Sequence, residues 1–154
     1  MKKLIISVSV AMLSIAGFAA SPSSNWFLSS DKGQISCEKI NVGTSKARIL
    51  LENGEKISIS IADIDSYSID GKIYNKKMLY SDGKPTGKMA FMQLIDSKNG
   101  LSLYESAELD YESVEPLQPV KYFYVYMGEA LHLALNEETL PSVFNFFGVK
   151  WSYR

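Results

Sequence analysis

The chain has 154 residues, of which 46% are hydrophobic and 21% are charged. Its single cysteine excludes an internal disulfide, and 16 basic against 17 acidic residues do not favour a nucleic-acid partner. This length and composition are typical of one globular domain.

The first 20 residues have the pattern of a secretory signal peptide. Lys2 and Lys3 precede an apolar segment, residues 4–20, which ends in small residues with no basic anchor behind it. A retained membrane helix is the alternative, but the segment is short for a membrane span. We therefore expect cleavage near Ala19 or Ala20 and export to the periplasm or the extracellular space, with no stable membrane span left.

Cleavage would leave residues 21–154 as a single β-rich domain. Removing 20 of the 154 residues takes away two lysines and no acids, so the mature chain has 14 basic and 17 acidic residues and a net charge of −3. Residues 21–32 are polar around Trp26. We expect them to form an N-terminal arm whose aromatic side chains dock on the domain.

Residues 34–42 alternate between apolar and polar side chains and predict the first strand, with a change of phase near Lys39. Cys37 lies within this strand. We expect it to be a small buried residue, and a reactive thiol is the alternative.

Residues 46–61 predict a hairpin with its turn at Asn53-Gly54. In the second arm of the hairpin, Ile57, Ile59 and Ile61 mark one face. An odd-length loop sets these isoleucines opposite the apolar residues of the first arm, Ala47, Ile49 and Leu51. An even loop would instead set Ile59 opposite Arg48. Register follows the hydrophobic pattern, so we predict the odd loop.

The alternation breaks at residues 62–65, which predict a turn or bulge. Asp63 and Asp65 resemble the start of a calcium-binding loop, but the following positions lack the oxygen-bearing side chains and the closing glutamate that such a loop needs. An Asx turn leading into the next strand is therefore the preferred interpretation.

Two further hairpins are predicted around Asp70-Gly71 and Asn99-Gly100, with a loop over residues 82–87 between them. Residues 105–119 hold five acids, and residues 72–88 hold five lysines. We expect the acidic stretch to be a solvated excursion between strands, and binding of a cation or a basic partner is the alternative. Surface pairs between the two stretches would add at most about 1 kcal/mol each.

The last hairpin is predicted from YFYVYM and LHLAL, in which tyrosines and leucines alternate with other residues. A three-residue loop at 128–130 pairs Val125 with Leu133 and places Tyr126 opposite His132. This register keeps the leucines on one face and the tyrosines on the other.

A short helix is predicted after this hairpin from a single apolar stripe, formed by Leu140, Val143, Phe144 and Phe147. Thr139 is expected to cap its start and Gly148 to end it in a left-handed conformation. The helix is too short to be stable alone, so its stripe must cover the leucine face of the hairpin. Residues 149–153 alternate and predict a closing strand.

These elements predict a mainly β fold, an antiparallel meander or a small barrel or coiled sheet of about nine strands with one short C-terminal helix. Three stretches, ARILLENGEKISI, ADIDSY and YFYVY…LHLAL, resemble small exported bacterial β-proteins. The resemblance implies export and a β-rich fold. It points to no named family and carries over no functional residue.

Catalysis is not expected, because the usual pairs of nucleophile and base are missing from the sequence. His132 is the only histidine, and together with Cys37 it supplies too few ligands for a zinc site. We therefore expect neither a cofactor nor a metal. A carboxylate-based hydrolase is the enzymatic alternative, with Asp63, Asp65, Glu105 and Glu108 as its candidate residues.

The tyrosine face of the last hairpin is the candidate binding surface, formed by Tyr122, Tyr124, Tyr126 and His132. Tyrosine offers flat apolar area with a hydrogen-bonding tip, which suits an envelope protein or a glycan. The alternative is that these are ordinary half-buried strand residues. The sequence thus predicts a non-catalytic exported domain that binds a protein or glycan, with a small barrel carrying an apolar ligand as the second hypothesis.

Overall fold

The computed structural model describes residues 25–81, 83–109 and 119–150, with the backbone alone at 107–109 and 119. The predicted signal peptide, residues 110–118 of the acidic stretch and the end of the predicted closing strand lie outside the described residues. Those predictions therefore stay predictions. Among the described helices, none is long and apolar enough to cross a membrane.

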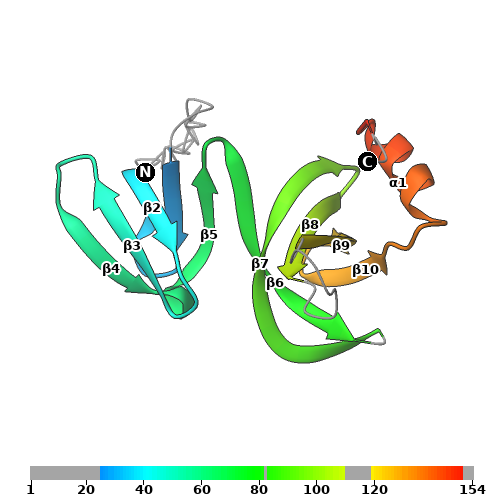
Figure 1. The fold of residues 1–154 in the computed structure, drawn as a ribbon, viewed down its shortest axis with the longest axis horizontal. Helices are drawn as coiled ribbons and strands as arrows, with labels where there is room; N and C mark the ends of the chain where they lie inside the picture. The colour runs from blue at the N-terminus through cyan, green and yellow to red at the C-terminus, as the bar shows by residue number, and fades with distance from the viewer. Residues whose placement is uncertain (1–24, 82, 110–118, 151–154) are drawn as a thin grey trace, which may run out of the picture.

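Within the described residues the chain forms one antiparallel sheet of ten strands, a short 3₁₀ turn and one α-helix (Figure 1). The elements in chain order are β1 (Asn25–Ser29), β2 (Gly33–Val42), β3 (Lys46–Leu51), β4 (Lys56–Ser60), η1 (Ile61–Asp63), β5 (Ile64–Ile69), β6 (Lys72–Ser81), β7 (Lys84–Lys98), β8 (Leu101–Leu109), β9 (Pro119–Met127), β10 (Ala130–Ala134) and α1 (Leu140–Phe147). The predicted mainly β class with one short C-terminal helix is confirmed. The sheet is open, with β10 and β4 as its edges, so it is a coiled sheet and not a closed barrel.

The strand order is β10-β9-β8-β7-β6-β5-β1-β2-β3-β4, so two meanders are joined through β5 and β1. η1 makes this order possible, because it turns the chain away from β4 and delivers β5 to β1. It overlaps the predicted interruption at 62–65, which is confirmed. The Ser60 hydroxyl caps this turn by accepting a hydrogen bond from the Ala62 N–H at 3.2 Å.

The prediction of an N-terminal arm at 21–32 is wrong over its described part. β1 lies inside the sheet, between β5 and β2, and Phe27 is fully buried there. The sequence of β1, NWFLS, places three apolar residues in succession and so shows no period-two alternation. In the fold, strands on both sides supply the backbone hydrogen bonds that the segment cannot make alone.

The Asn-Gly and Asp-Gly turns form the predicted hairpins. The odd loop at Asn53-Gly54 is confirmed, because Ile49 pairs with Ile57. The two-residue loops Asp70-Gly71 and Asn99-Gly100 have positive φ at both positions, at 51° and 77° and at 54° and 78°. Such turns match the twist of the flanking strands, which explains why Asn-Gly and Asp-Gly predicted them.

β2 contains a bulge between Cys37 and Lys39, at the predicted change of phase. Cys37 is buried, as expected for a small core residue. Burial and the nearby Glu52 carboxylate raise the pKa of its thiol. The thiolate that a nucleophile or a metal ligand needs is therefore disfavoured.

The predicted loop at 82–87 is wrong for residues 84–87, because β7 begins at Lys84 and pairs with the end of β6, and only Gly83 of the described residues lies in the turn. Gly87 has a φ of 75°, and the Thr86 hydroxyl donates a hydrogen bond to the Leu79 carbonyl at 2.9 Å. Glycine and proline break regular ladders, but here a bulge in β7, where residues 86–88 stand opposite Leu79 of β6, accommodates them within the hairpin.

The two faces of the sheet carry different cores in its two halves. Residues paired across neighbouring strands share a face, and the ladder from β5 to β9 puts Tyr67, Tyr74 and Phe123 on the same one. In the first half, this face holds the core around Phe27. In the second half, α1 covers it. The opposite face of the second half holds a third cluster, formed by Met92, Tyr104 and Tyr126.

The second half of the sheet is curled onto that third cluster. Lys77 Nζ donates a hydrogen bond to the Gly128 carbonyl at 3.0 Å, and the Tyr126 hydroxyl donates one to the Met78 carbonyl at 2.7 Å. These bonds join β6 to β9 and its turn, three strands away, which in a flat sheet would be roughly 14 Å apart. The two halves therefore roll toward opposite faces, and Figure 1 shows them side by side, joined through β5, β6 and β7.

α1 has the predicted bounds and the predicted buried stripe. Leu140, Phe144 and Phe147 are buried against the β8–β9 core, where the Phe123 and Phe144 rings meet edge to face at 5.1 Å. Gly148 has a φ of 76°, and the Val149 N–H donates a hydrogen bond to the Phe144 carbonyl at 2.9 Å. This is the Schellman ending predicted from the sequence.

Thr139 is the N-cap residue of α1, as predicted, but its side chain makes no capping hydrogen bond to the helix. The Asn136 Oδ1 atom instead accepts hydrogen bonds from the N–H groups of Glu138 and Thr139, at 3.1 Å and 2.9 Å. Asn136 belongs to the same turn-forming stretch, so propensity alone did not distinguish the two residues.

The predicted three-residue loop in the last hairpin is also wrong. Met127 pairs with Ala130, so the loop is Gly128-Glu129, with a φ of 60° at its glycine. A bulge at His132 then restores the predicted pairing of Val125 with Leu133. The pairing of Val125 with Leu133 was thus predicted correctly, but the length of the loop was not. The hairpin has one extra residue, and the alternation does not tell whether it lies in the loop or in a strand.

Candidate functional site

The structure places the four predicted binding residues in different environments. Tyr126 is only 1% exposed, Tyr124 is half-buried, and Tyr122 is 43% exposed. His132 is exposed in the bulge, and Leu131 stands opposite Tyr126 in its place. Of the four residues, Tyr122 and His132 are thus exposed to a binding partner. Tyr126 lies in the interior of the curled second half.

Tyr126 and Tyr104 form the walls around a buried ammonium group. The Lys77 side chain is 7% exposed, and its Nζ lies 5.4 Å and 5.6 Å from the centroids of these two rings. The same nitrogen forms an ion pair at 3.0 Å with Glu129, whose side chain is 82% exposed. Burial raises the pKa of Tyr126 to about 12, and the neighbouring Tyr124 adds to the shift. The neutral Tyr126 ring can therefore face the lysine at any ordinary pH.

Sequence reasoning missed Lys77 because its neighbours gave no sign of burial. It lies in the lysine-rich stretch 72–88, which is expected to be solvated. Its position inside the curl became visible only when the distant turn at Gly128 was placed next to it.

The described ion pairs do not join the acidic stretch to the lysine-rich stretch. Lys77 pairs with Glu129, and Glu105 pairs with Lys121 at 3.1 Å. Lys77 and Glu105 thus do not pair between the two stretches, and the side chains of the other acids in the acidic stretch lie outside the described residues. The partner of Glu105 is Lys121 on the adjacent strand β9, and not a lysine of the lysine-rich stretch.

The candidate carboxylates lie on separate elements. Asp63 is exposed in η1, and Asp65 in β5 accepts a hydrogen bond from the Ser30 hydroxyl at 2.5 Å. Glu105 lies in β8, and the side chain of Glu108 is outside the described residues. Within the described residues, no group of three or more His, Cys, Asp or Glu side chains is placed to hold a metal ion.

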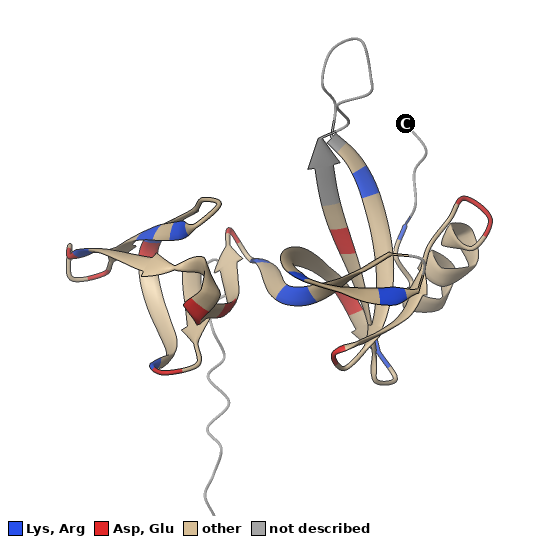
Figure 2. Cartoon of the chain, turned by 90° about the horizontal axis from the view of Figure 1, so that it is seen from below, with Lys and Arg blue, Asp and Glu red and all other residues tan. Residues whose placement is uncertain are grey.

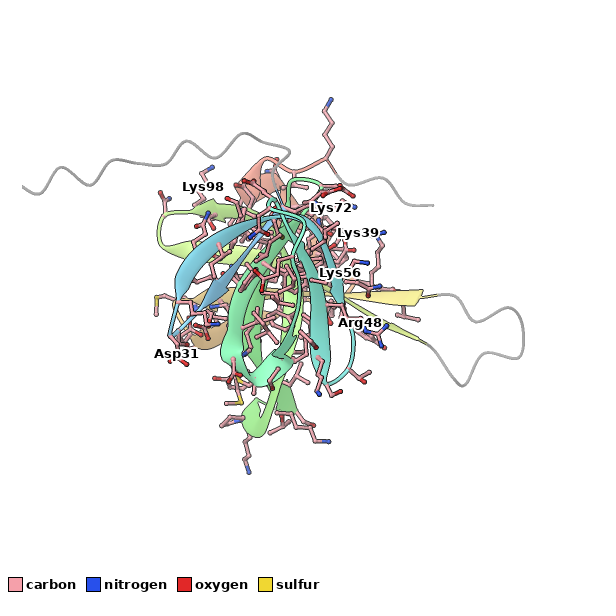
Figure 3. The ribbon with its side chains drawn as sticks, turned by 90° about the vertical axis from the view of Figure 1, so that its left-hand side faces the viewer. Asp31, Lys39, Arg48, Lys56, Lys72 and Lys98 are labelled. Atoms are coloured by element: carbon pink, nitrogen blue, oxygen red, sulfur yellow. The ribbon has the colours of Figure 1, made fainter. Side chains whose placement is uncertain are left out.

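Four cations gather on the outer face of β2, β3 and β4, and we call this surface the basic face: Lys39, Lys46, Arg48 and Lys56. All four are exposed. Figure 2 shows the basic positions of these neighbouring strands on one side of the first half, and Figure 3 shows Lys39, Arg48 and Lys56 along the same side of the ribbon. The described ion pairs use other lysines, so the basic face has no carboxylate partner among the described residues.

Strand register fixes the pattern of the basic face. Asn41, Arg48 and Ser58 lie in one row across the three strands. In the next row, Lys39 and Lys56 flank Leu50. Strands are about 4.8 Å apart, so the two lysines start roughly 10 Å apart. Arg48 thus lies diagonally between them, with an amide on one side and a hydroxyl on the other.

The basic face is hollowed where these rows meet. A depression of about 440 Å³ is lined by Lys39, Asn41, Arg48, Leu50, Lys56 and Ser58, with Ile49 and Ile57 beneath. A neighbouring polar hollow of about 490 Å³ extends it past Lys46 to the β2–β3 turn. The cations therefore border a continuous concave surface. Alternation along β2–β4 was visible in the sequence, but the alignment of three cations from separate strands was not.

No protein-family model, curated protein sequence or solved structure matches this chain.

Proposed function

We propose that this chain is an exported, non-catalytic binding domain whose basic face holds an acidic glycan. The observation that carries the proposal is the set of unpaired cations around the hollow, Lys39, Arg48 and Lys56. Guanidinium and ammonium groups bind carboxylates, and the fork of Arg48 can do so in a bidentate way.

A glycan is favoured as the ligand because the basic face mixes charge with neutral hydrogen-bonding groups. Asn41 and Ser58 stand on either side of Arg48, where they can bind hydroxyl groups beside a carboxylate. An acidic polysaccharide supplies both kinds of group along one chain. The area is open and spans three strands, which suits a polymer lying across the sheet.

The packing under α1 supports this function over the carriage of an apolar ligand. Leu103, Phe123 and Val125 fill the space between the sheet and the helix, together with the buried stripe of α1. A carrier would need an apolar void there, because a ligand must be enclosed by the walls that shape it.

The test measures binding to polygalacturonate, with neutral dextran as the reference glycan. Lys39→Gln, Arg48→Gln and Lys56→Gln are combined in one variant. The matched control combines Lys84→Gln, Lys88→Gln and Lys150→Gln, which removes the same charge from exposed positions elsewhere. We expect the first variant to lose about tenfold or more in affinity and the control to lose little. Binding should also weaken with added salt.

Two outcomes contradict the proposal. Equal losses in both triple variants would mean that net charge, and not the basic face, attracts the polymer. Stronger binding to poly-glutamate than to polygalacturonate, with the same dependence on Arg48, would assign the basic face to an acidic protein instead of a glycan.

A further inference from the structure

A second hollow lies where the two halves of the sheet meet, and we call it the waist pocket. It has a volume of about 430 Å³ and is lined by Leu28, Asp65, Ser66, Asn75, Lys77 and Glu129, with Met89 and Lys76 at its border. Its residues come from both halves, since Leu28 is in β1 and Glu129 is in the turn after β9. It is distinct from the basic face, which lies on β2–β4.

The floor of the waist pocket is set by register. Leu28 pairs with Ser66, and Ser66 pairs with Asn75, so these three side chains form one row across β1, β5 and β6. Asn75 is fixed by donating a hydrogen bond to the Tyr104 hydroxyl at 3.0 Å. The described pairing of β5 with β6 stops at this row, which leaves the continuing edge of β6 facing the hollow.

The walls carry opposite charges on different strands. Asp65 on β5 receives only a hydroxyl hydrogen bond, from Ser30, and has no cationic partner among the described residues. Lys77 on β6 is held in place by the Gly128 carbonyl and two tyrosine rings. Its carboxylate partner, Glu129, is 82% exposed on a tight turn, so the turn side of this pair faces solvent while the lysine itself is buried.

Lys76 is engaged in other contacts and does not compete with Lys77 for a ligand carboxylate. Lys76 Nζ donates to the Ala62 carbonyl at 2.7 Å and lies over the Phe91 ring at 5.8 Å. Leu28 and the exposed Met89 add apolar surface to the lining. Besides Lys76 and the paired Lys77 and Glu129, the pocket thus offers the Asp65 carboxylate and an apolar contact.

We infer that the waist pocket binds a small zwitterion of the amino-acid or short-peptide class. The ligand carboxylate replaces Glu129 at Lys77, and its ammonium group is held by Asp65. Its side chain lies against Leu28 and Met89. Because both halves of the sheet contribute contacts, the bound ligand also fixes the halves relative to each other.

The experiment titrates the full mature chain with alanyl-alanine and follows backbone and Asn75 side-chain resonances by NMR. The N-acetylated and the C-amidated dipeptides are the matched probes, since each lacks one charge. We expect saturable shifts at Ser66, Asn75 and Lys77 with the free dipeptide, and an affinity about tenfold weaker for each blocked form.

Asp65→Asn separates ligand recognition from an effect on folding. This variant should bind the free dipeptide about tenfold more weakly and should no longer distinguish it from the N-acetylated form. Its preference for a free over an amidated carboxyl group should remain. Glu137→Gln, an exposed change outside the pocket, should bind as the unaltered chain does.

The proposal is overturned if no saturable shift occurs up to about 10 mM dipeptide. It is also overturned if the blocked and free forms bind equally, or if Asp65→Asn weakens all three to the same degree. Shifts confined to the basic face would assign the dipeptide to that surface instead.

Discussion

Tyr126 shows how one residue can satisfy a sequence pattern and still have an unexpected role. Alternation placed it correctly on the face opposite Val125, although Leu131 shares its face, and its ring forms a wall around Lys77 while its hydroxyl donates a hydrogen bond to the Met78 carbonyl. Tyr126 resists ionisation chiefly because burial desolvates its charged form, and the neighbouring tyrosines and Glu129 raise its pKa further.

We predict that the free energy of unfolding falls as pH rises from about 10 to about 12. Tyr126 ionises near pH 10 when unfolded and at about 12 when folded, so the stabilisation is complete below the unfolded pKa and is lost through the folded pKa. Tyr67, whose pKa burial also raises to about 12, contributes in the same direction. Urea unfolding across this range measures the slope.

Two phenylalanine substitutions test the assignment to Tyr126. Tyr126→Phe should make the loss of stability with pH shallower, and Tyr67 and Tyr74, whose pKa values burial also raises, should contribute to the remainder. Tyr122→Phe changes an exposed ring and should leave the slope unchanged. An unchanged slope in Tyr126→Phe would show that this hydroxyl ionises equally well in both states.

At the scale of elements, the hairpins and the helix show which local signals are sufficient. Asn-Gly and Asp-Gly turns predicted three loops because few other residues accept positive φ. The last hairpin lacks that signal, since Gly128 alone has positive φ in its loop. Its turn pairs Met127 with Ala130, and the bulge at His132 then brings Leu133 opposite the buried Val125.

We predict that Phe144→Ala lowers the free energy of unfolding by about 3–5 kcal/mol, because it empties a packed site between α1 and the sheet. Phe144 is 4% exposed and meets Phe123 edge to face. Phe146→Ala is the matched control, since Phe146 lies on the same helix and is 40% exposed. It should cost less than about 1 kcal/mol in chemical denaturation. Similar losses in the two variants would mean that α1 does not pack through this stripe.

At the scale of the whole molecule, the opposite roll of the two halves produces three apolar clusters from one sheet. The first half covers its apolar face by curling over it. The second half curls over one of its faces, and α1 covers the other. The basic face and the waist pocket both follow from this shape, because one lies on the outside of the first curl and the other at the junction.

We predict that the mature protein begins within a few residues of Ser21. The reason is the Lys2-Lys3 start and the small residues that close the apolar segment 4–20. N-terminal sequencing of protein recovered from the cell envelope or the medium measures this. Protein that keeps Met1 and remains in the cytoplasm would contradict both the cleavage and the export on which the proposed function depends.

The sequence by itself determined the elements whose causes are local. Period-two alternation gave most strands, turn residues with positive φ gave the hairpins, and the stripe through Phe144 gave α1 with its ending at Gly148. Only the tertiary structure decided the rest. β1 needed two neighbours to become a strand, and Lys77 became buried only because the Gly128 turn, 51 residues away, closes over it. The cations of the basic face come from three strands and meet only through register. Burial and charge clustering depend on which distant segments are adjacent, and a local pattern contains no information about that.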